Sequence, residues 1–502
     1  MEKDLVLCVD IGTTNIKSGI VDEEGNILSL FRKELPLERD QEGRAEHNPD
    51  IIFNSFIEAV REVSKGYEDK ISLLIPSSYM FGLIPVDKNL NPLTGIMTLL
   101  DMRPKETFEE LLEILDIYEI YKRTGCPSTF HYPLFKIFWL KKKRKDIFEK
   151  TRFFLSSKDF ILLKLLSEPF TEPSISSATE IMNVRTLKWD DYAMSILGIK
   201  EDQLPPIVPS DKILAKIPDE TKKILGLSSE VYILPGVYDG GAVGIGIGAF
   251  EEGVGVINIG TTAMLRVAYP LPIFDKEDSL RIQTYYLSSG KWFIGAAINN
   301  AGIILKWLRD NIFNLSYENL TLEAEKEKSL NLFFLPYITG ERDREIGNIA
   351  SGVFFGLRNY HNKGHMIRAC MEGVAFSLKT IYDALRDNNV RVKEIRAGGG
   401  GTNSPLWMDI FSSIFGLPIK VSNVEEPALL GSAILGFYAL GKFSDLDSAT
   451  KKMVKVEKIY IPSNDKIEYY EKRFKFFKFL IKNLKEAFEY HNKLDIWEEK
   501  NE

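Results

Sequence analysis

The sequence predicts an α/β fold built from two similar halves, each around its own core. The chain has 502 residues, 44% of them hydrophobic, which is long enough for two domains with sizeable cores. The stretch "CVDIGTTN" at 8–15 returns as "VINIGTTA" at 256–263, each time as a strand-like run ending in a polar turn. Strand and helix patterns alternate through both halves. The repeat places a boundary near residue 245, so we expect domains at 1–245 and 246–502.

The first half opens with strands that pair with their neighbours. Residues 5–12, "LVLCVDIG", read as a buried strand, and apolar runs on both sides of "DEEGN" at 22–26 indicate a hairpin. From residue 48 the apolar spacing becomes helical, with Asn48 or Asp50 as the N-cap. Residues 70–78, "KISLLIPSS", form another strand, and helical segments follow to about residue 165.

The second half repeats this order. We expect strands in "GVGVINIGTT" (253–262), "AMLRVAY" (263–269), "KWFIGAAI" (291–298) and "VKEIRAGGGG" (392–401). Helical spacing covers 301–312, 365–387, 405–416, 426–441 and about 465–492.

Charge and composition exclude several classes of partner. The net charge is −7 and the pI is about 5.6, so nothing argues for nucleic acid or an acidic membrane. No apolar stretch approaches the roughly 18 residues that span a bilayer, and no signal peptide is present, so we expect a cytoplasmic chain. The three cysteines have no metal-binding spacing. The basic run "KKKRK" at 141–145 fits an exposed helix end.

The repeated turn suits phosphate binding. Gly12 lets the backbone approach a ligand closely, and successive N–H groups with the Thr13 and Thr14 hydroxyls can surround a phosphate. The second copy offers Gly260, Thr261 and Thr262, with Asn258 in the place of Asp10. Asp10, at a strand end, can hold hydrated Mg²⁺. A plain turn between strands is the alternative for a single copy, and the matched repeat argues against it.

Two further glycine-rich segments carry candidate chemistry. "GGGG" at 398–401 lies between a strand and a helix, where a turn can pass under an adenine or ribose, and neither a Walker motif nor a dinucleotide fingerprint is present. "PGVYDGGAVGIG" at 235–246 places Asp239 in a turn after a strand. That carboxylate could accept the proton of a hydroxyl attacking a phosphoryl group, or it could cap a helix.

Together these motifs resemble the FGGY carbohydrate kinases, over residues of about 3–455. The resemblance rests on "VDIGTTNIKSGIVDEEG", "GRAEHNPD", "YPLFKIFWLKKKR", "INIGTT" and "GGGGTNSPLWMDIFSSIFGLPIKVSNVEEPALLGSAI". It implies the duplicated actin/hexokinase/Hsp70-like (ribonuclease H-like) fold, with ATP in a cleft between the two domains and Mg²⁺ as the metal. A small sugar or sugar acid would be the partner, and a homodimer would agree with many relatives.

The resemblance also implies residue roles. Asp239 matches the catalytic base, and Asp10 and Asp239 would lie at the metal. Lys17 would lie near the transferred phosphate, or else form a strand-edge salt bridge. Gly302 would approach the triphosphate, and adenosine would lie between Gly399, Gly400 and Asn403.

The resemblance places the sugar contacts at Met80, Phe81, Asp101, His131 and Gly240. Met80 and Asp101 fit the family pattern, whereas Phe81 stands where His is usual and either stacks on a sugar or packs in the core. Arg103 could meet an aldonate carboxylate or pair with Asp101. Leu99 replaces a Trp, Arg344 a Pro and Ile346 a Trp, so the exact sugar stays open.

The motifs look most like those of gluconate kinases, which implies phosphorylation of gluconate at its primary hydroxyl. A ketopentose such as xylulose comes second, and other polyols or aldonates stay open. Two readings of other classes remain. One is an actin- or Hsp70-like ATPase that switches a partner surface, and the other is a degenerate kinase kept as a sugar-binding regulator.

Overall fold

Two mixed β-sheets form the centre of the molecule. The computed structural model describes residues 4–342, 346–422 and 424–494. The first sheet has six strands in the order β12-β13-β6-β1-β2-β3. In chain order these are β1 (Leu5–Ile11), β2 (Asn15–Val21), β3 (Ile27–Glu34), β6 (Ile71–Ser78), β12 (Ala215–Lys216) and β13 (Tyr232–Ile233). The predicted hairpin is confirmed, because β2 pairs antiparallel with both β1 and β3.

The second sheet repeats the plan of the first. Its seven strands run in the order β16-β17-β15-β14-β20-β21-β22. They are β14 (Val254–Ile259), β15 (Ala263–Tyr269), β16 (Gln283–Ser288), β17 (Lys291–Ile298), β20 (Glu394–Gly398), β21 (Ile419–Ser422) and β22 (Val456–Tyr460). In each sheet a central strand, β1 or β14, is antiparallel to the next strand in sequence and parallel to a later one, β6 or β20. The predicted duplication is therefore visible strand by strand.

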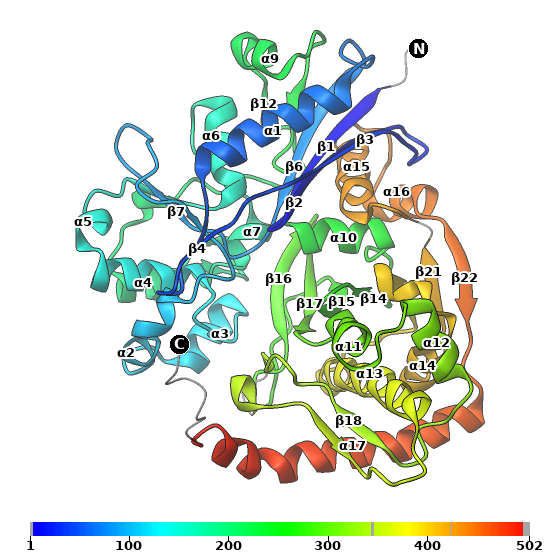
Figure 1. Cartoon of the computed structure of the whole chain (residues 1–502). Helices are drawn as coiled ribbons and strands as arrows, with labels where there is room; N and C mark the ends of the chain where they lie inside the picture. The colour runs from blue at the N-terminus through cyan, green and yellow to red at the C-terminus, as the bar shows by residue number, and fades with distance from the viewer. Residues whose placement is uncertain (1–3, 343–345, 423, 495–502) are drawn as a thin grey trace.

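Helices cover the sheets in both halves (Figure 1). Asn48 is the N-cap of the first, and its side chain accepts from the backbone N–H groups of Asp50 and Ile51. The helices that matter for the site are α1 (Pro49–Ser64), α4 (Pro133–Lys143), α6 (Ser157–Leu166), α7 (Pro173–Ser177), α10 (Asp239–Ile247), α11 (Gly302–Trp307), α12 (Tyr317–Glu325), α13 (Lys363–Asp387), α14 (Pro405–Phe415) and α15 (Pro427–Ala439). Helix α17 (Asn464–His491) runs along the outside of the second half.

Helices α10 and α15 cross each other between the two sheets, and each packs on the sheet of the other half of the chain. Helix α10 follows the first sheet in sequence but also packs on β14 and β20, whereas α15 packs on β1, β2 and β6. Their backbones touch directly, since a Cβ on Gly246 would lie 1.9 Å from the Pro427 carbonyl oxygen and one on Gly431 would lie 1.8 Å from that of Ala242. Only glycine fits such a contact.

The segment 235–246 differs from its prediction as a glycine-rich turn. Its second part is helix α10, which begins at Asp239, although Tyr238 is its N-cap and no side chain caps it. The glycines act as a smooth helix face against α15, which the local sequence alone does not reveal. The expected boundary between residues 245 and 246 falls inside α10, and as an exact position it stays a prediction.

Candidate active site

The two predicted phosphate turns connect the central strand of each sheet to its neighbour. The Gly12 N–H donates to the Asn15 carbonyl at 2.9 Å, and the Gly260 N–H donates to the Thr262 carbonyl at 2.9 Å. Within the described part of the chain, no partner takes up the hydroxyls of Thr13, Thr14, Thr261 and Thr262. Both turns therefore offer free hydroxyls and exposed backbone, as phosphate oxygens require.

A buried histidine fixes the first turn. His47 Nε2 lies 2.9 Å from the Thr13 carbonyl oxygen, and its Nδ1 lies 2.9 Å from the Tyr79 hydroxyl. Burial lowers the pKa of His47, so the ring is neutral and can accept a hydrogen bond from the Tyr79 hydroxyl while donating one to the Thr13 carbonyl. The motif "GRAEHNPD" contains this histidine, but its spacing alone gives no hint of the contact.

Asp10 lies at the end of β1, next to the first turn. It pairs across the sheet with Lys17 on β2 and Ser77 on β6, and the Ser77 hydroxyl donates to its Oδ1 at 2.7 Å. Burial raises the pKa of this carboxyl, while the Ser77 hydrogen bond and the Lys17 charge oppose the rise. Asn258 holds the equivalent place in the second sheet, so only one of the two turns has a carboxylate.

Asp239 lies at the start of α10, near Asp10. It keeps partial access to solvent while being surrounded by protein. Its Oδ1 accepts from the Gly240 N–H at 2.6 Å. Burial, followed by the negative charge of Asp10, raises the pKa of Asp239 to about 7. A carboxyl that changes protonation near neutral pH is suited to act as a base.

The pair Asp10 and Asp239 fits the needs of Mg²⁺. No cluster of three or more His, Cys, Asp or Glu side chains occurs among the residues that the structure describes. Mg²⁺ is commonly held by one or two carboxylates, together with water and phosphate oxygens. Two acidic groups near enough to raise a pKa, beside a phosphate turn, match that coordination.

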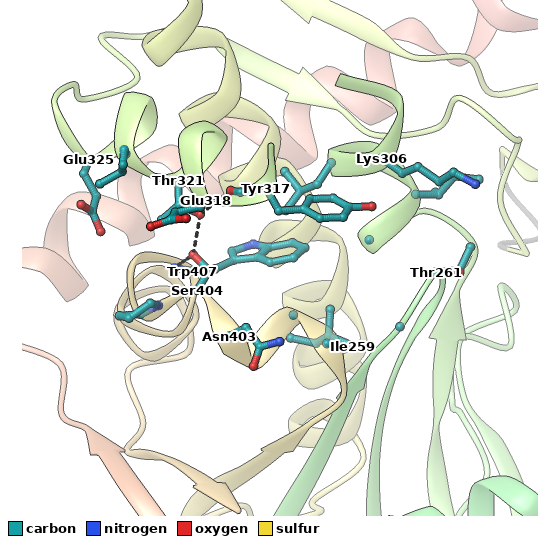
Figure 2. A pocket seen from close by; sticks show the side chains of 18 residues that line it. Ile259, Thr261, Lys306, Tyr317, Glu318, Thr321, Glu325, Asn403, Ser404 and Trp407 are labelled. Carbon is teal, nitrogen blue, oxygen red and sulfur yellow. Dashed lines mark hydrogen bonds between the residues drawn. The ribbon is translucent and has the colours of Figure 1, made fainter. Parts of the chain in front are cut away.

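A cavity of about 710 Å³ opens beside the second turn (Figure 2). Of the predicted nucleotide residues, Gly260, Thr261, Gly302, Gly400 and Asn403 line it. A Cβ on Gly302 would lie 2.4 Å from the Gly260 carbonyl oxygen, whereas one on Gly400 would meet nothing within 4 Å. Gly302 is therefore needed for packing, and Gly400 leaves the cavity wall open.

Gly399 shapes the cavity without lining it. Its φ is +84°, in the left-handed region, and a Cβ there would lie 2.6 Å from the Ile259 carbonyl oxygen. Helix α12 supplies an opposite wall that sequence reasoning missed, with Tyr317 and Thr321 facing Asn403, Ser404 and Trp407 (Figure 2). The Thr321 hydroxyl donates to Ser404 Oγ at 3.3 Å, which joins the two walls.

The expectation that Lys17 stands near the transferred phosphate meets a competing contact. Its Nζ lies 2.9 Å from Glu426 Oε2, and Glu426 also binds Arg32 at 2.7 Å. The structure thus places Lys17 in the strand-edge salt bridge, which links β2 to the residue preceding α15. In this arrangement the ammonium group holds two halves of the molecule together.

A buried lysine holds the predicted sugar-contacting segment. Lys136 Nζ donates to the carbonyls of Phe81 at 2.5 Å, Thr98 at 2.7 Å and Met97 at 3.3 Å. Phe81 has a φ of +65°, and its ring meets Tyr132 edge-on at 5.1 Å, while Met80 is half-buried against the core. Three carbonyls satisfy the ammonium group without any carboxylate, so Lys136 ties the Met80–Phe81 turn to the segment before Leu99.

Arg103 is occupied by neighbouring carboxylates. Its Nη2 lies 2.6 Å from Asp101 Oδ2 and also binds Glu46, while its Nε lies 3.0 Å from Asp101 Oδ1. Asp101 is fully buried and also accepts from the Ala45 N–H at 3.2 Å. The structure therefore favours the reading in which Arg103 pairs with Asp101, and both side chains serve to fix the loop.

His131 lies beside this loop and remains available. Its Nδ1 lies 3.0 Å from the Leu99 carbonyl oxygen, so the ring is held while Nε2 has no partner in the described residues. Burial, followed by the charge of Arg342, lowers the pKa of His131 to about 4, so the ring is neutral. Gly240 is half-buried next to Asp239. Of the substituted positions, Ile346 is buried, and Arg344 lies outside the described residues.

A second buried network positions the loop before Asp239. Ser174 Oγ accepts from the Tyr238 N–H at 3.0 Å and donates to Glu172 Oε1 at 2.8 Å. Glu172 is in turn paired with the fully buried Lys158 at 2.6 Å. These residues belong to α6 and the start of α7, far from Asp239 in sequence, and no local pattern signals them.

Comparison with known proteins agrees with this geometry. Residues 5–246 match the N-terminal domain of the FGGY family of carbohydrate kinases, and residues 255–440 match its C-terminal domain. A gluconokinase from Bacillus subtilis is 34% identical over 460 residues, which is 89% of each chain. A xylulose kinase from Staphylococcus epidermidis is 28% identical over 495 residues, covering 97% of this chain and 98% of that protein.

Solved structures give the same result. The crystal structure of gluconate kinase from Lactobacillus acidophilus superposes with a TM-score of 0.93 at 28% identity, covering 97% of this chain and all 100% of that one. A ligand-bound xylulose kinase from the same organism gives 0.91 at 29% identity, over 96% and 98% of the two chains. The predicted duplicated, actin/hexokinase-like two-domain fold is confirmed. The chain belongs to the FGGY family of carbohydrate kinases, enzymes that transfer a phosphoryl group to an alcohol of a sugar.

Proposed function

We propose that this protein phosphorylates a small sugar acid at its primary hydroxyl with ATP and Mg²⁺, and that gluconate, giving 6-phosphogluconate, is the leading substrate. The observation that carries the proposal is the position of Asp239. Its carboxyl lies at the start of α10 near Asp10 and has a pKa of about 7. Relatives named gluconokinase and xylulose kinase, and a solved gluconate kinase, support an acceptor of five or six carbons.

The residues divide the reaction between them. Asp239 would take the proton of the acceptor hydroxyl as that oxygen attacks the γ-phosphorus. The turns at Gly12–Thr14 and Gly260–Thr262 would hold phosphate oxygens from both sides through backbone N–H groups and free hydroxyls. When bound, Mg²⁺ supplies positive charge that offsets charge on the phosphates. Asp10 and Asp239 would hold it, while the cavity lined by Asn403 and Gly400 would take adenosine.

Xylulose is the second candidate, and other polyols or aldonates follow. Sequence relatives named xylulose kinase cover nearly the whole chain. Lys136 holds the Phe81 carbonyl, so Met80 and Phe81 would present the same apolar surface to either acceptor. Small differences in hydrogen bonding decide between such substrates.

The test is coupled ADP release with Mg·ATP against gluconate, other aldonates, ketopentoses, polyols and aldohexoses. We expect the highest kcat/KM with gluconate. A clear preference for xylulose would keep the mechanism and replace the substrate. If ATP binds and no acceptor supports turnover, the chain would instead be a sugar- and nucleotide-binding regulator. Turnover of ATP that ignores all acceptors would favour a partner-switching ATPase. Oligomeric state, with a homodimer as the expectation, is measured in parallel by light scattering.

A further inference from the structure

The first phosphate turn and the Met80–Phe81 turn leave the first sheet side by side. Strands β1 and β6 run parallel as far as the pair Ile11 and Ser78. The last backbone bond between them runs from the Tyr79 N–H to the Ile11 carbonyl at 3.0 Å. Beyond this bond one strand ends at Gly12 and the other continues into the Met80–Phe81 turn. Any further support of one turn by the other must therefore come from side chains.

His47 bridges the two turns just past the end of these strands. Its Nε2 lies 2.9 Å from the Thr13 carbonyl oxygen in the phosphate turn. Its Nδ1 lies 2.9 Å from the hydroxyl of Tyr79, which directly precedes Met80. A carbonyl oxygen only accepts, so Nε2 of the neutral ring carries the proton and Nδ1 accepts from the Tyr79 hydroxyl. One rigid ring thus joins both turns.

The Tyr79 ring carries this contact into the Met80–Phe81 turn. The side chain is 3% exposed, and a Cβ on Gly82 would lie 3.0 Å from its Cε2. The chain therefore leaves Tyr79, turns, and returns against the ring of the same residue at Gly82. The rings of His47 and Tyr79 also meet edge to face, with centroids 5.4 Å apart. A shift of the Tyr79 ring would move the turn that lies between Tyr79 and Gly82.

His47 is itself held by a separate sheet. It is the last residue of β5 (Ala45–His47), which pairs with β8 (Ile96–Met97) in a register that places His47 opposite Ile96. The next residue, Asn48, is the N-cap of α1. The His47 side chain is fully buried, so a ligand cannot reach the ring, and both ring nitrogens are occupied by protein groups. The contribution of His47 is therefore to hold other groups in place.

We propose that His47 is a positioning residue for phosphoryl transfer. Acting through Tyr79, it holds the Met80–Phe81 turn at a fixed distance from the phosphate turn, so that the acceptor hydroxyl lies in line with the γ-phosphate. Reacting atoms must come within about 3–3.5 Å of each other, and a misplacement of about 1 Å can cost about 10²-fold in rate. Each turn keeps its own ligand contacts when the link is broken, so the link acts on kcat more than on either KM. This inference rests on the proposed function.

The test is steady-state kinetics of Tyr79→Phe, His47→Gln and the double variant, with the acceptor that wild-type protein phosphorylates best. Tyr79→Phe removes one hydroxyl and keeps the ring against Gly82, whereas His47→Gln keeps a donor for Thr13 and loses the acceptor of the Tyr79 hydroxyl. We expect each to lower kcat about 10- to 100-fold, while KM for ATP and KM for the acceptor change less than about threefold. Both changes break the same bond, so the double variant should be about as slow as either single variant.

His361→Gln is the matched control. His361 also joins two loops, since its Nδ1 accepts from the Arg358 N–H at 2.9 Å and its Nε2 lies 3.2 Å from the Leu330 carbonyl oxygen. These loops belong to the second half, and none of the three residues lines the nucleotide cavity. Its kcat should equal that of wild type. Calorimetry with a non-hydrolysable ATP analogue counts binding sites per chain, and an unchanged count shows that a lower kcat does not reflect less folded protein.

The outcomes separate this proposal from the proposed function. If wild-type protein phosphorylates an acceptor and Tyr79→Phe does so with the same kcat, the positioning role is wrong while the proposed function stands. A raised KM for the acceptor at constant kcat, losses that multiply in the double variant, or a site count that falls in step with kcat would also overturn it. If xylulose is the best acceptor, the substrate proposal fails, and the expected loss of kcat still supports the role of His47. Wild-type protein that phosphorylates no acceptor overturns both.

Discussion

Asp239 is the side chain on which the proposed chemistry depends most directly. Replacing it with Asn keeps its size and removes the base, so we expect Asp239→Asn to lower kcat about 10²- to 10⁴-fold. The cavity proposed for adenosine lies beside Gly260 and Asn403, so the affinity for ATP measured without Mg²⁺ should hold. Steady-state kinetics and ATP titration check this. An Asn variant with wild-type turnover would remove Asp239 from the mechanism.

The protonation of Asp239 sets the direction of the pH dependence. Its pKa is raised to about 7, and only the carboxylate can accept a proton, so kcat/KM should rise with pH and level off above about pH 7. For stability the sign is opposite. Because its pKa is raised in the folded state, this carboxyl contributes fully to folding stability below pH 3.8, which is its ordinary pKa. That stabilisation is lost as the pH rises through about 7. Asp239→Asn should therefore melt at a higher temperature than wild type at pH 8, and this advantage should fade near pH 4.

The sequence predicted those residues whose role depends on local pattern. Asp10 lies near the end of an apolar strand, and Gly12 and Gly260 directly follow such strands, so their place at the strand ends could be read from the chain. Arg103 could not be assigned in this way, because its partner Glu46 lies 57 positions away in sequence. The contact of Arg342 with Asn299 spans 43 positions, so it could not be predicted from the sequence either.

Among the larger elements, Lys136 on α4 joins two loops that carry predicted sugar contacts. Replacing it with Met removes hydrogen bonds to Phe81, Met97 and Thr98. We expect KM for the sugar to rise about tenfold, as a hydrogen bond from a charged group is worth about 1.5–3 kcal/mol, while KM for ATP stays constant. Lys142→Met is the matched control, because Lys142 lies on the same helix and pairs with Glu110 at the surface. Equal effects on both KM values would argue against a role in positioning the sugar.

The glycines of the site have different functions, and a pair of substitutions separates them. In Gly246→Ala the new methyl would lie 1.9 Å from the Pro427 carbonyl oxygen, so α10 and α15 must move apart. We expect loss of soluble folded protein or a melting temperature lowered by several degrees. In Gly400→Ala the methyl meets no protein atom within 4 Å and enters the nucleotide cavity, so the fold should persist while KM for ATP rises. Circular dichroism and kinetics distinguish the two, and unaltered folding of Gly246→Ala would contradict the tight crossing.

Strands and helices with clear periodicity were predicted well, and the glycine-rich segment was not. Strands β1 and β14 are buried on both faces, as their continuous apolar runs indicate, and α13 follows a regular helical spacing. Residues 239–247 contain four glycines, which in isolation favour a turn over a helix. Packing against α15 stabilises that helix, and such tertiary support cannot be read from propensity.

For the molecule as a whole, ligand binding should be visible as stabilisation. The nucleotide cavity is built from β14, α11, α12 and the turn at 400–403, so ATP would join segments that lie far apart in sequence. ATP at 100 times its Kd should stabilise the folded state by about 2.7 kcal/mol. Differential scanning fluorimetry with Mg·ATP, with the sugar, and with both measures this. No shift with Mg·ATP at saturating concentration would contradict the assignment of the cavity.

The described part of the chain contains no helix long and apolar enough to cross a bilayer. The overall duplication was the easiest feature to predict, because the same turn occurs twice in matched strand contexts. The exchange of α10 and α15 between the sheets was not predictable, since it depends on which surfaces meet after both halves have folded.

The direct backbone contact between Gly246 and Gly431 also affects how the two halves of the molecule can rotate against each other. Two helices that touch backbone to backbone have no interlocked side chains to release before they can turn against each other. When one half rotates relative to the other, points near this contact travel least. Asp239 lies only three residues before Ala242, whose carbonyl touches Gly431, or about 4.5 Å along the helix axis. The carboxylate proposed as the catalytic base would therefore lie close to the pivot of any such rotation, and its direction would change little.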